Sequence, residues 1–154
     1  RDLACDAHAI EAAIWFHDAV YDTRSASNEA DSAELARREL TALQWPAHAI
    51  DKVEALVVAT AGHAADGVAD EDTRLFLDLD LSILGQPAHV YAAYSEGIRA
   101  EYRQVEEAAY RAGRRRVLES FLSRPTIFQT TRWREAWEAQ ARANIRRELD
   151  ALSA

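Results

Sequence analysis

Helix-favouring residues run along almost the whole chain, and they limit what the chain can fold into. Ala, Leu, Glu and Arg dominate a sequence of 154 residues that holds only five Gly and three Pro. These four residue types have high intrinsic helix propensities, and long alternating strand patterns are scarce. Hydrophobic residues make up 49% of the chain, which is enough for one sizeable core. The composition therefore predicts an all-α, single-domain bundle of about six to eight helices.

Capping and breaking residues set the expected helix boundaries. Asn28 is a typical helix start, Pro46 and Pro87 stand where helices open, and Gly85 is a typical stop. The expected helices cover residues 6–21, 28–43, 47–62, 71–84, 87–105, 106–122 and 131–152. No repeat, linker or low-complexity tract interrupts this order, so residues 1–154 are expected to form one domain.

The doublet His17-Asp18 is the first candidate site. In a helix, the spacing of Ile10, Ala13, Ile14, His17 and Tyr21 places these residues along one face, with Asp18 at its edge. A carboxylate that faces a core is costly unless it is paired or binds a metal. The doublet is therefore expected to be either a buried hydrogen-bonded pair or half of a metal site.

The segment around Asp78 and Asp80 is the second candidate. As a helix it is largely buried, with Asp80 inside the apolar arc and Asp78 on the remaining side beside Arg74. The strict alternation of residues 75–83 also fits a half-buried strand, in which both aspartates would point outward. The helix is favoured because no partner strand is evident.

Charge and cysteine content exclude several classes of function. The formal net charge of -8 argues against binding to polymeric nucleic acid or to an anionic membrane surface. Residues 1–96 carry 18 acidic and 6 basic side chains, whereas residues 97–154 carry 8 acidic and 12 basic ones. The acidic part suits a cation site and the basic part suits an anion site, but solvated helix faces would give the same distribution. Cys5 is the only cysteine, which fits a reducing, cytoplasmic location without a disulfide. We find no membrane span and no signal peptide.

Several motifs together resemble the HD superfamily of metal-dependent phosphohydrolases, and in particular a bacterial subgroup of predicted HD phosphohydrolases. The matching segments, which extend over nearly the whole chain, are Ala13-Ile14-Trp15-Phe16-His17-Asp18-Ala19-Val20-Tyr21-Asp22, Asn28-Glu29-Ala30-Asp31-Ser32-Ala33, Thr60-Ala61-Gly62-His63, Leu77-Asp78-Leu79-Asp80-Leu81, Ile98-Arg99-Ala100-Glu101-Tyr102 and Arg124-Pro125-Thr126-Ile127-Phe128. The resemblance implies an HD-type helical bundle that hydrolyses a small phosphate ester or a nucleotide through a metal-activated water.

The resemblance also implies roles for individual residues. His17, Asp18 and Asp80 would hold a divalent metal such as Mn, Fe, Co, Ni, Mg or Zn, with Asp18 and Glu29 as the catalytic residues. Glu29 is otherwise a first-turn helix acid. His63 would bind a second metal or the substrate phosphate, and is otherwise a cation at a helix end. Apart from the resemblance, Arg99, Tyr102 and Arg103 are candidates for contact with the substrate, and otherwise they only solvate an exposed helix.

One departure from the family pattern weakens the expected site. The family's first ligand histidine lies upstream of the doublet on a separate helix, and no residue of this chain fills that place. The chain holds no Met and starts at Arg1, so we expect this N-terminal helix to be missing and the metal to be held weakly or lost. Two alternatives stay open, a non-catalytic helical module that binds a ligand or partner and, less favoured, a diiron oxygenase. The long C-terminal helix either docks within the chain or pairs with a second copy as a homodimer.

Overall fold

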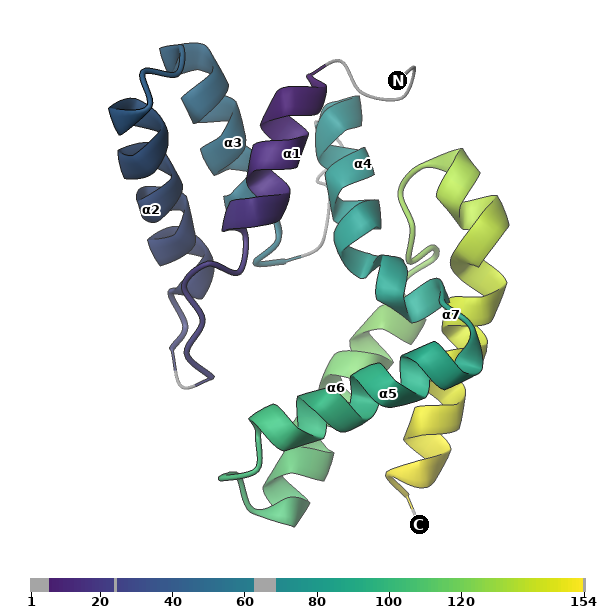
Figure 1. The fold of residues 1–154 in the computed structure, drawn as a ribbon. Coiled ribbons are helices and arrows are strands. Elements are labelled where there is room, and N and C mark those ends of the chain that lie inside the picture. The colour runs from purple at the N-terminus through teal and green to yellow at the C-terminus, as the bar shows by residue number, and fades with distance from the viewer. Residues whose placement is uncertain (1–5, 24, 63–68, 154) are drawn as a thin grey trace. The chain divides into compact units, whose positions relative to one another are not determined.

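The computed structural model describes residues 6–23, 25–62 and 69–153, and this part of the chain is all-helical (Figure 1). The elements are α1 (Ala7–Phe16), α2 (Asn28–Ala42), α3 (Ala47–Ala59), α4 (Glu71–Asp80), the 3₁₀ helix η1 (Leu81–Gly85), α5 (Ala88–Glu101), α6 (Glu107–Ser123) and α7 (Thr131–Ala151). The predicted all-α fold class is confirmed, and the strand alternative for residues 75–83 is wrong. None of the described helices combines the length and the apolar character that crossing a bilayer requires.

The starts of α1, α3 and α5 follow local signals, whereas α2 starts after Ser27 without a side-chain cap. The Asp6 carboxylate accepts a hydrogen bond from the backbone N–H of Ala9 at 3.0 Å, as expected for an N-cap. Pro46 and Pro87 stand directly before α3 and α5, where a residue without an N–H costs the helix nothing. The sequence therefore predicted most helix starts to within a residue.

The helix ends were predicted less well. The first helix was expected to reach Tyr21, but α1 ends at Phe16. The expected helix of residues 71–84 changes at Asp80 from the α-helix α4 to the tighter η1. Helices α3 and α5 also stop earlier than expected, at Ala59 and Glu101. Hydrophobic spacing continues beyond these ends, so periodicity alone does not locate them.

The described residues form two compact units, the first up to Asp80 and the second from Leu81 onward. In the first unit α1 packs against α2, α3 and α4 (Figure 1). Its buried core consists of Ala9, Ile10, Ala12, Ala13, Ala33, Ala36, Leu40, Ala49, Ile50, Val53, Leu56, Val57, Leu75, Phe76 and Leu77. Many of these are alanines, whose small side chains let neighbouring helices approach closely. That the two units form one domain stays a prediction.

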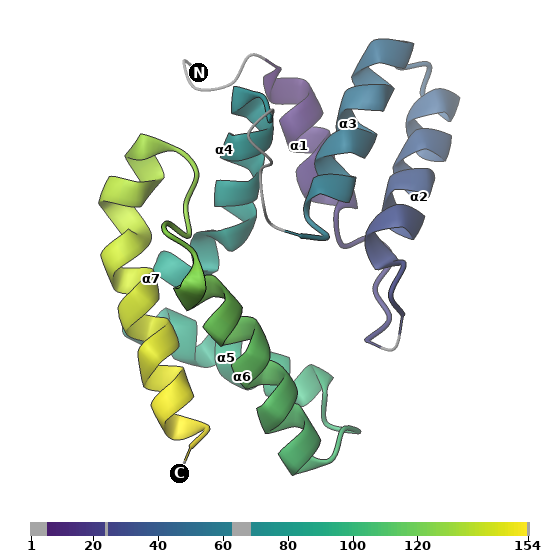
Figure 2. The same cartoon turned by 180° about the vertical axis from the view of Figure 1, so that it is seen from behind.

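In the second unit α7 packs against η1, α5 and α6, as the reverse view shows (Figure 2). Its core consists of Leu81, Leu84, Tyr91, Leu118, Phe121, Ile127, Phe128, Ala141 and Ile145. The buried Asn144 of α7 donates through Nδ2 to the backbone oxygens of Leu84, at 2.9 Å, and Gln86, at 2.8 Å. This amide satisfies carbonyls at the end of η1 that have no helical partner.

The Arg124–Phe128 segment, one of those that carry the family resemblance, is held by two side chains of α7. The Glu138 carboxylate accepts from the backbone N–H groups of Ile127, at 3.0 Å, and of the next residue, at 3.2 Å. Arg142 donates to Glu138 at 2.7 Å and to the backbone oxygen of Leu122 at 3.1 Å. These contacts give the segment a structural role in the second unit.

Gly85 allows η1 to approach α7 closely. A Cβ added there would lie 2.4 Å from Cβ and 2.8 Å from Cγ of Trp137. The Cβ position of Trp137 is set by the α7 backbone, so rotation of the side chain cannot relieve this clash. We expect Gly85→Ala to lower the free energy of unfolding by roughly 1–3 kcal/mol, as overpacking does. The measurement is urea denaturation followed by circular dichroism.

Gly97 provides the matched control for this prediction. It lies inside α5, and an added Cβ would face open space. We expect Gly97→Ala to be neutral or to stabilise the protein by about 0.5–1 kcal/mol, because Ala is the better helix former. Equal effects of the two substitutions would show that η1 and α7 are not tightly packed.

Candidate metal centre

The His17 ring is fixed at the C-terminal end of α1. Its Nδ1 lies 2.9 Å from the backbone oxygen of Ile14, to which it donates a hydrogen bond. The edge of the ring also contacts the buried Phe76 of α4, with ring centroids 6.0 Å apart. In metal-binding histidines, a hydrogen bond of this kind at one ring nitrogen selects the other as the ligand. The contacts of His17 therefore leave Nε2 as the ring nitrogen that is available to act as a ligand.

Two carboxylates converge on Nε2 of His17. The nitrogen lies 3.3 Å from Oδ2 of Asp18 and 3.4 Å from Oδ1 of Asp80. Asp80 stands one helical turn after Phe76 on α4, so the same face of that helix both packs against the ring and presents the carboxylate. The structure thus brings Asp80, which is distant in the sequence, to the adjacent residues His17 and Asp18, and these three residues were predicted to share a site.

The two neighbouring carboxylates raise the pKa of His17. The hydrogen bond with Asp80 is the largest influence, and it outweighs the opposing effect of burial to raise the pKa of His17 to about 9. The charge of Asp18 acts in the same direction. When no cation is bound, the imidazole therefore stays protonated at neutral pH between two negative groups.

Two side chains of α2 shape the loop that leaves the doublet. Ser32 is fully buried, and its hydroxyl accepts from the N–H of Val20 at 3.0 Å and donates to the oxygen of the same residue at 3.2 Å. The Asn28 amide pairs in the same way with the backbone of Asp22, at 2.9 and 3.0 Å. These bonds satisfy backbone groups of Val20 and Asp22, which a longer α1 would have satisfied by helical hydrogen bonds.

The donor set fits a divalent cation by its chemistry. One imidazole nitrogen and two carboxylates are borderline-to-hard ligands that suit Mn²⁺, Fe²⁺, Co²⁺ or Zn²⁺. Ligands bonded to one ion at about 2.1 Å are roughly 3.0–3.4 Å apart, which is the range in which Nε2 and each carboxylate oxygen lie. Among the described residues, however, no group of three or more His, Cys, Asp or Glu side chains is arranged so that it could hold a metal ion.

Two expectations about burial were wrong. Asp18 was expected at the edge of the buried face, but its side chain is 71% exposed. Asp78 was expected beside Arg74 on the polar side, but it is fully buried. Asp78 stands three residues after the buried Leu75 in α4, and this helical spacing puts it on the face that packs in the core.

The remaining predicted residues of the first half of the chain lie as follows. Glu29 is half-buried in the first turn of α2, where its carboxylate also suits the helix N-terminus. His63 and Cys5 lie outside the described residues. The catalytic role of Glu29 and the metal or phosphate role of His63 stay predictions.

The sequence did not predict a partly buried ion pair near the start of α1. Asp72 is 1% exposed, forms an ion pair with Lys52 and accepts a hydrogen bond from the N–H of Asp6 at 3.1 Å. This contact fastens the start of α1 to α3 and α4. Asp72 stands three residues before the buried Leu75, and this helical spacing was the only signal in the sequence.

The predicted substrate residues all belong to the second unit. Arg99 forms an ion pair with Glu107 at 2.9 Å and donates to the backbone oxygen of Tyr102 at 2.8 Å. Tyr102 packs against Tyr110, with ring centroids 6.3 Å apart, and Arg103 is exposed. Arg99 and Tyr102 therefore help to build the second unit, and their contact with a substrate stays a prediction.

Comparison with known proteins identifies no relative of this chain. No family model matches it, and no curated protein or solved structure matches it either. The chemistry of the site must therefore be inferred from its own residues.

Proposed function

We propose that this chain is an HD-type metal-dependent phosphohydrolase whose cation site is built by His17, Asp18 and Asp80. The observation that carries the proposal is the approach of Asp18 and Asp80 to Nε2 of His17, at 3.3 and 3.4 Å. Its support is the hydrogen bond from Nδ1 to Ile14, because an imidazole fixed in this way offers Nε2 as a ligand.

Each residue of the site would have a separate role in binding the cation or in transferring a proton. His17 and Asp80 supply ligands from α1 and α4, and the exposed Asp18 supplies one at the solvent side. A bound divalent cation would lower the pKa of a coordinated water and polarise a phosphoryl oxygen. Glu29, as the proposed general acid or base, would take or deliver the proton.

The substrate class follows from the chemistry of the site and from charge. Phosphoryl transfer to water needs positioning and charge neutralisation, which a cation held by two carboxylates provides. The net charge of -8 disfavours a polymeric nucleic acid. We therefore propose a small phosphate ester or a nucleotide as the substrate.

Metal content tests the proposed site directly. We expect the protein, purified without chelator, to bind close to one Mn²⁺ per chain at saturating Mn²⁺, but weakly, because this chain supplies only three of the four ligands that the family resemblance implies. Asp80→Asn should weaken Mn²⁺ binding by at least about 100-fold, since even indirect partners of metal ligands contribute roughly 10–100-fold. Elemental analysis and calorimetric titration measure the two quantities.

Asp51 provides a matched control. It is an exposed aspartate of α3 that forms an ion pair with Arg37 at 2.7 Å. Asp51→Asn should leave Mn²⁺ binding unchanged. If the folded wild-type protein takes up none of Mn²⁺, Fe²⁺, Co²⁺, Ni²⁺ or Zn²⁺, the hydrolase proposal fails and the module that binds a ligand or partner is favoured.

A further inference from the structure

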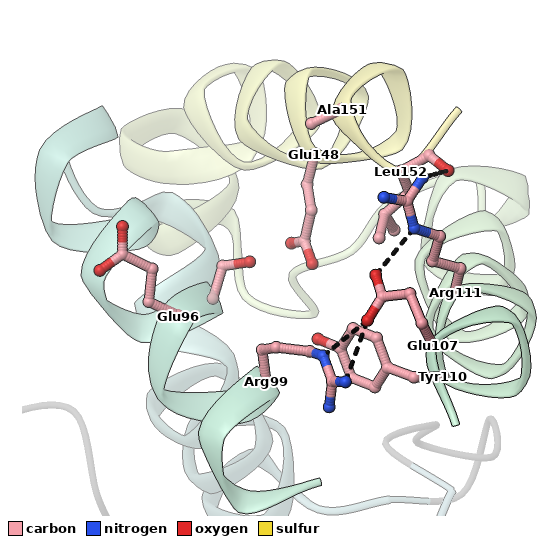
Figure 3. Close-up of a pocket in the computed structure, with 9 residues that line it drawn as sticks. Glu96, Arg99, Glu107, Tyr110, Arg111, Glu148, Ala151 and Leu152 are labelled. Atoms are coloured by element: carbon pink, nitrogen blue, oxygen red, sulfur yellow. Dashed lines mark hydrogen bonds and ion pairs between the residues drawn. The ribbon is translucent and has the colours of Figure 1, made fainter. Parts of the chain in front are cut away.

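Two guanidinium groups from different helices converge on one carboxylate beside a pocket of the second unit (Figure 3). Arg99 of α5 lies 2.9 Å from Oε2 of Glu107, and Arg111 of α6 lies 2.8 Å from Oε1. The pocket has a volume of about 370 Å³ and is lined by all three residues. Both oxygens of one exposed carboxylate are therefore held by arginine.

The two arginines are also held by groups other than Glu107. The Arg99 guanidinium lies over the ring of Tyr110, 4.6 Å from its centroid, and donates to the backbone oxygen of Tyr102 at 2.8 Å. Arg111 donates to the backbone oxygen of Leu152 at 3.4 Å. These contacts would keep the guanidinium groups of both arginines at the pocket if the Glu107 side chain moved away.

Glu107 itself is weakly retained. Its side chain is 51% exposed, and its pair with Arg111 is an i, i+4 pair on a helix surface. Exposed ion pairs of this kind contribute little to stability because water and salt compete for both partners. Deeper in the pocket, Glu148 is neutralised by Arg114 at 2.8 Å, whereas Glu96 on the wall is exposed.

We propose that this pocket binds a small phosphate-bearing molecule whose phosphate replaces the Glu107 carboxylate between Arg99 and Arg111. Guanidinium groups bind phosphate oxygens with the same paired hydrogen bonds that they offer to a carboxylate. The Tyr110 ring and the Leu152 side chain form an apolar wall for the organic part of the ligand. The volume falls within the usual range for small-molecule sites, about 300–1,000 Å³. The proposed metal centre plays no part in this inference.

Titration with inorganic phosphate tests the proposal. The protein is treated with a chelator so that no metal contributes, and amide resonances of α5 and α6 are followed by NMR at constant ionic strength. Glu107→Gln removes the internal competitor and should raise the affinity for phosphate roughly two- to fivefold. Arg99→Gln and Arg111→Gln should each lower it roughly tenfold or more, as expected for lost hydrogen bonds to a charged group.

The pair Arg115–Glu119 is the matched control, because it is another exposed i, i+4 pair of α6, at 3.2 Å, and does not line the pocket. Arg115→Gln and Glu119→Gln should leave phosphate affinity unchanged. Equal effects of the Glu107 and Glu119 substitutions would overturn the proposal, because binding would then reflect general surface charge. Absence of saturable binding, or equal affinity for acetate, would overturn it too. The Glu107→Gln result does not depend on the arginine variants folding.

Discussion

Replacing Glu148 with glutamine is expected to lower the free energy of unfolding by about 3–5 kcal/mol, the cost of breaking a buried ion pair from one side. Glu148 of α7 and Arg114 of α6 lie 2.8 Å apart, and their side chains are 8% and 9% exposed. The Tyr91 hydroxyl also donates to the Glu148 carboxylate. The substitution would leave the Arg114 charge buried without its counter-ion. Urea denaturation at pH 7 measures the loss.

Two further variants show whether the cost comes from the orphaned charge. Glu119→Gln removes the partner of Arg115 in an exposed pair and should cost about 0.5 kcal/mol or less. Replacing all three interacting groups, Arg114→Met and Glu148→Leu with Tyr91→Phe, should recover most of the lost stability, since similar apolar replacements of buried pairs are often neutral. If Glu148→Gln costs no more than Glu119→Gln, the pair is not buried in solution.

The Arg114–Glu148 pair also makes the free energy of unfolding depend on pH in the acidic range. Burial raises the pKa of Glu148, but the hydrogen bonds from Arg114 and Tyr91 outweigh this and leave the pKa below its ordinary value. Because the pKa is lower in the folded protein, the stabilisation is fully present above the unfolded value of about 4.3 and is lost as the pH falls through the folded value. The stability difference between wild type and Glu148→Gln should therefore narrow below about pH 4.3.

Replacing His17 with alanine is expected to reduce metal-dependent hydrolysis of p-nitrophenyl phosphate by roughly 10²–10³-fold, the range for removing one electrostatic stabiliser of a transition state. His17 is the residue on which both carboxylates converge, so its loss would leave Asp18 and Asp80 as two like charges without a common partner. The measurement is the initial rate in Mn²⁺, with folding checked by circular dichroism.

His48 supplies the control for this prediction. It is an exposed histidine of α3, and His48→Ala should leave the rate unchanged. A folded His17→Ala variant that keeps the wild-type rate would exclude this residue from the reaction. If the His17→Ala variant loses the hydrolysis rate but still binds Mn²⁺, His17 acts on the substrate or the water and does not hold the cation.

Much of the helical framework was predictable from local chemistry. Asp6 caps α1, and Pro46 and Pro87 precede α3 and α5, because each of these effects involves only residues within one turn. The pairing of His17 with Asp80 was predicted from the family resemblance, and the spacing of Asp80 after Phe76 agreed with it. The path of the chain after α1 was not predictable in this way, since Val20 and Asp22 are held there by Ser32 and Asn28 of α2.

The sequence by itself therefore determined the fold class and most helix starts, whereas the residues of the candidate metal centre stay a prediction. The tertiary structure alone decided that Asp78 is buried, that Asp18 is exposed and that Arg99 and Arg111 share Glu107. The physical reason is the range of the interactions. Helix propensity and capping act over a few neighbouring residues, whereas burial and charge pairing depend on which helices pack together.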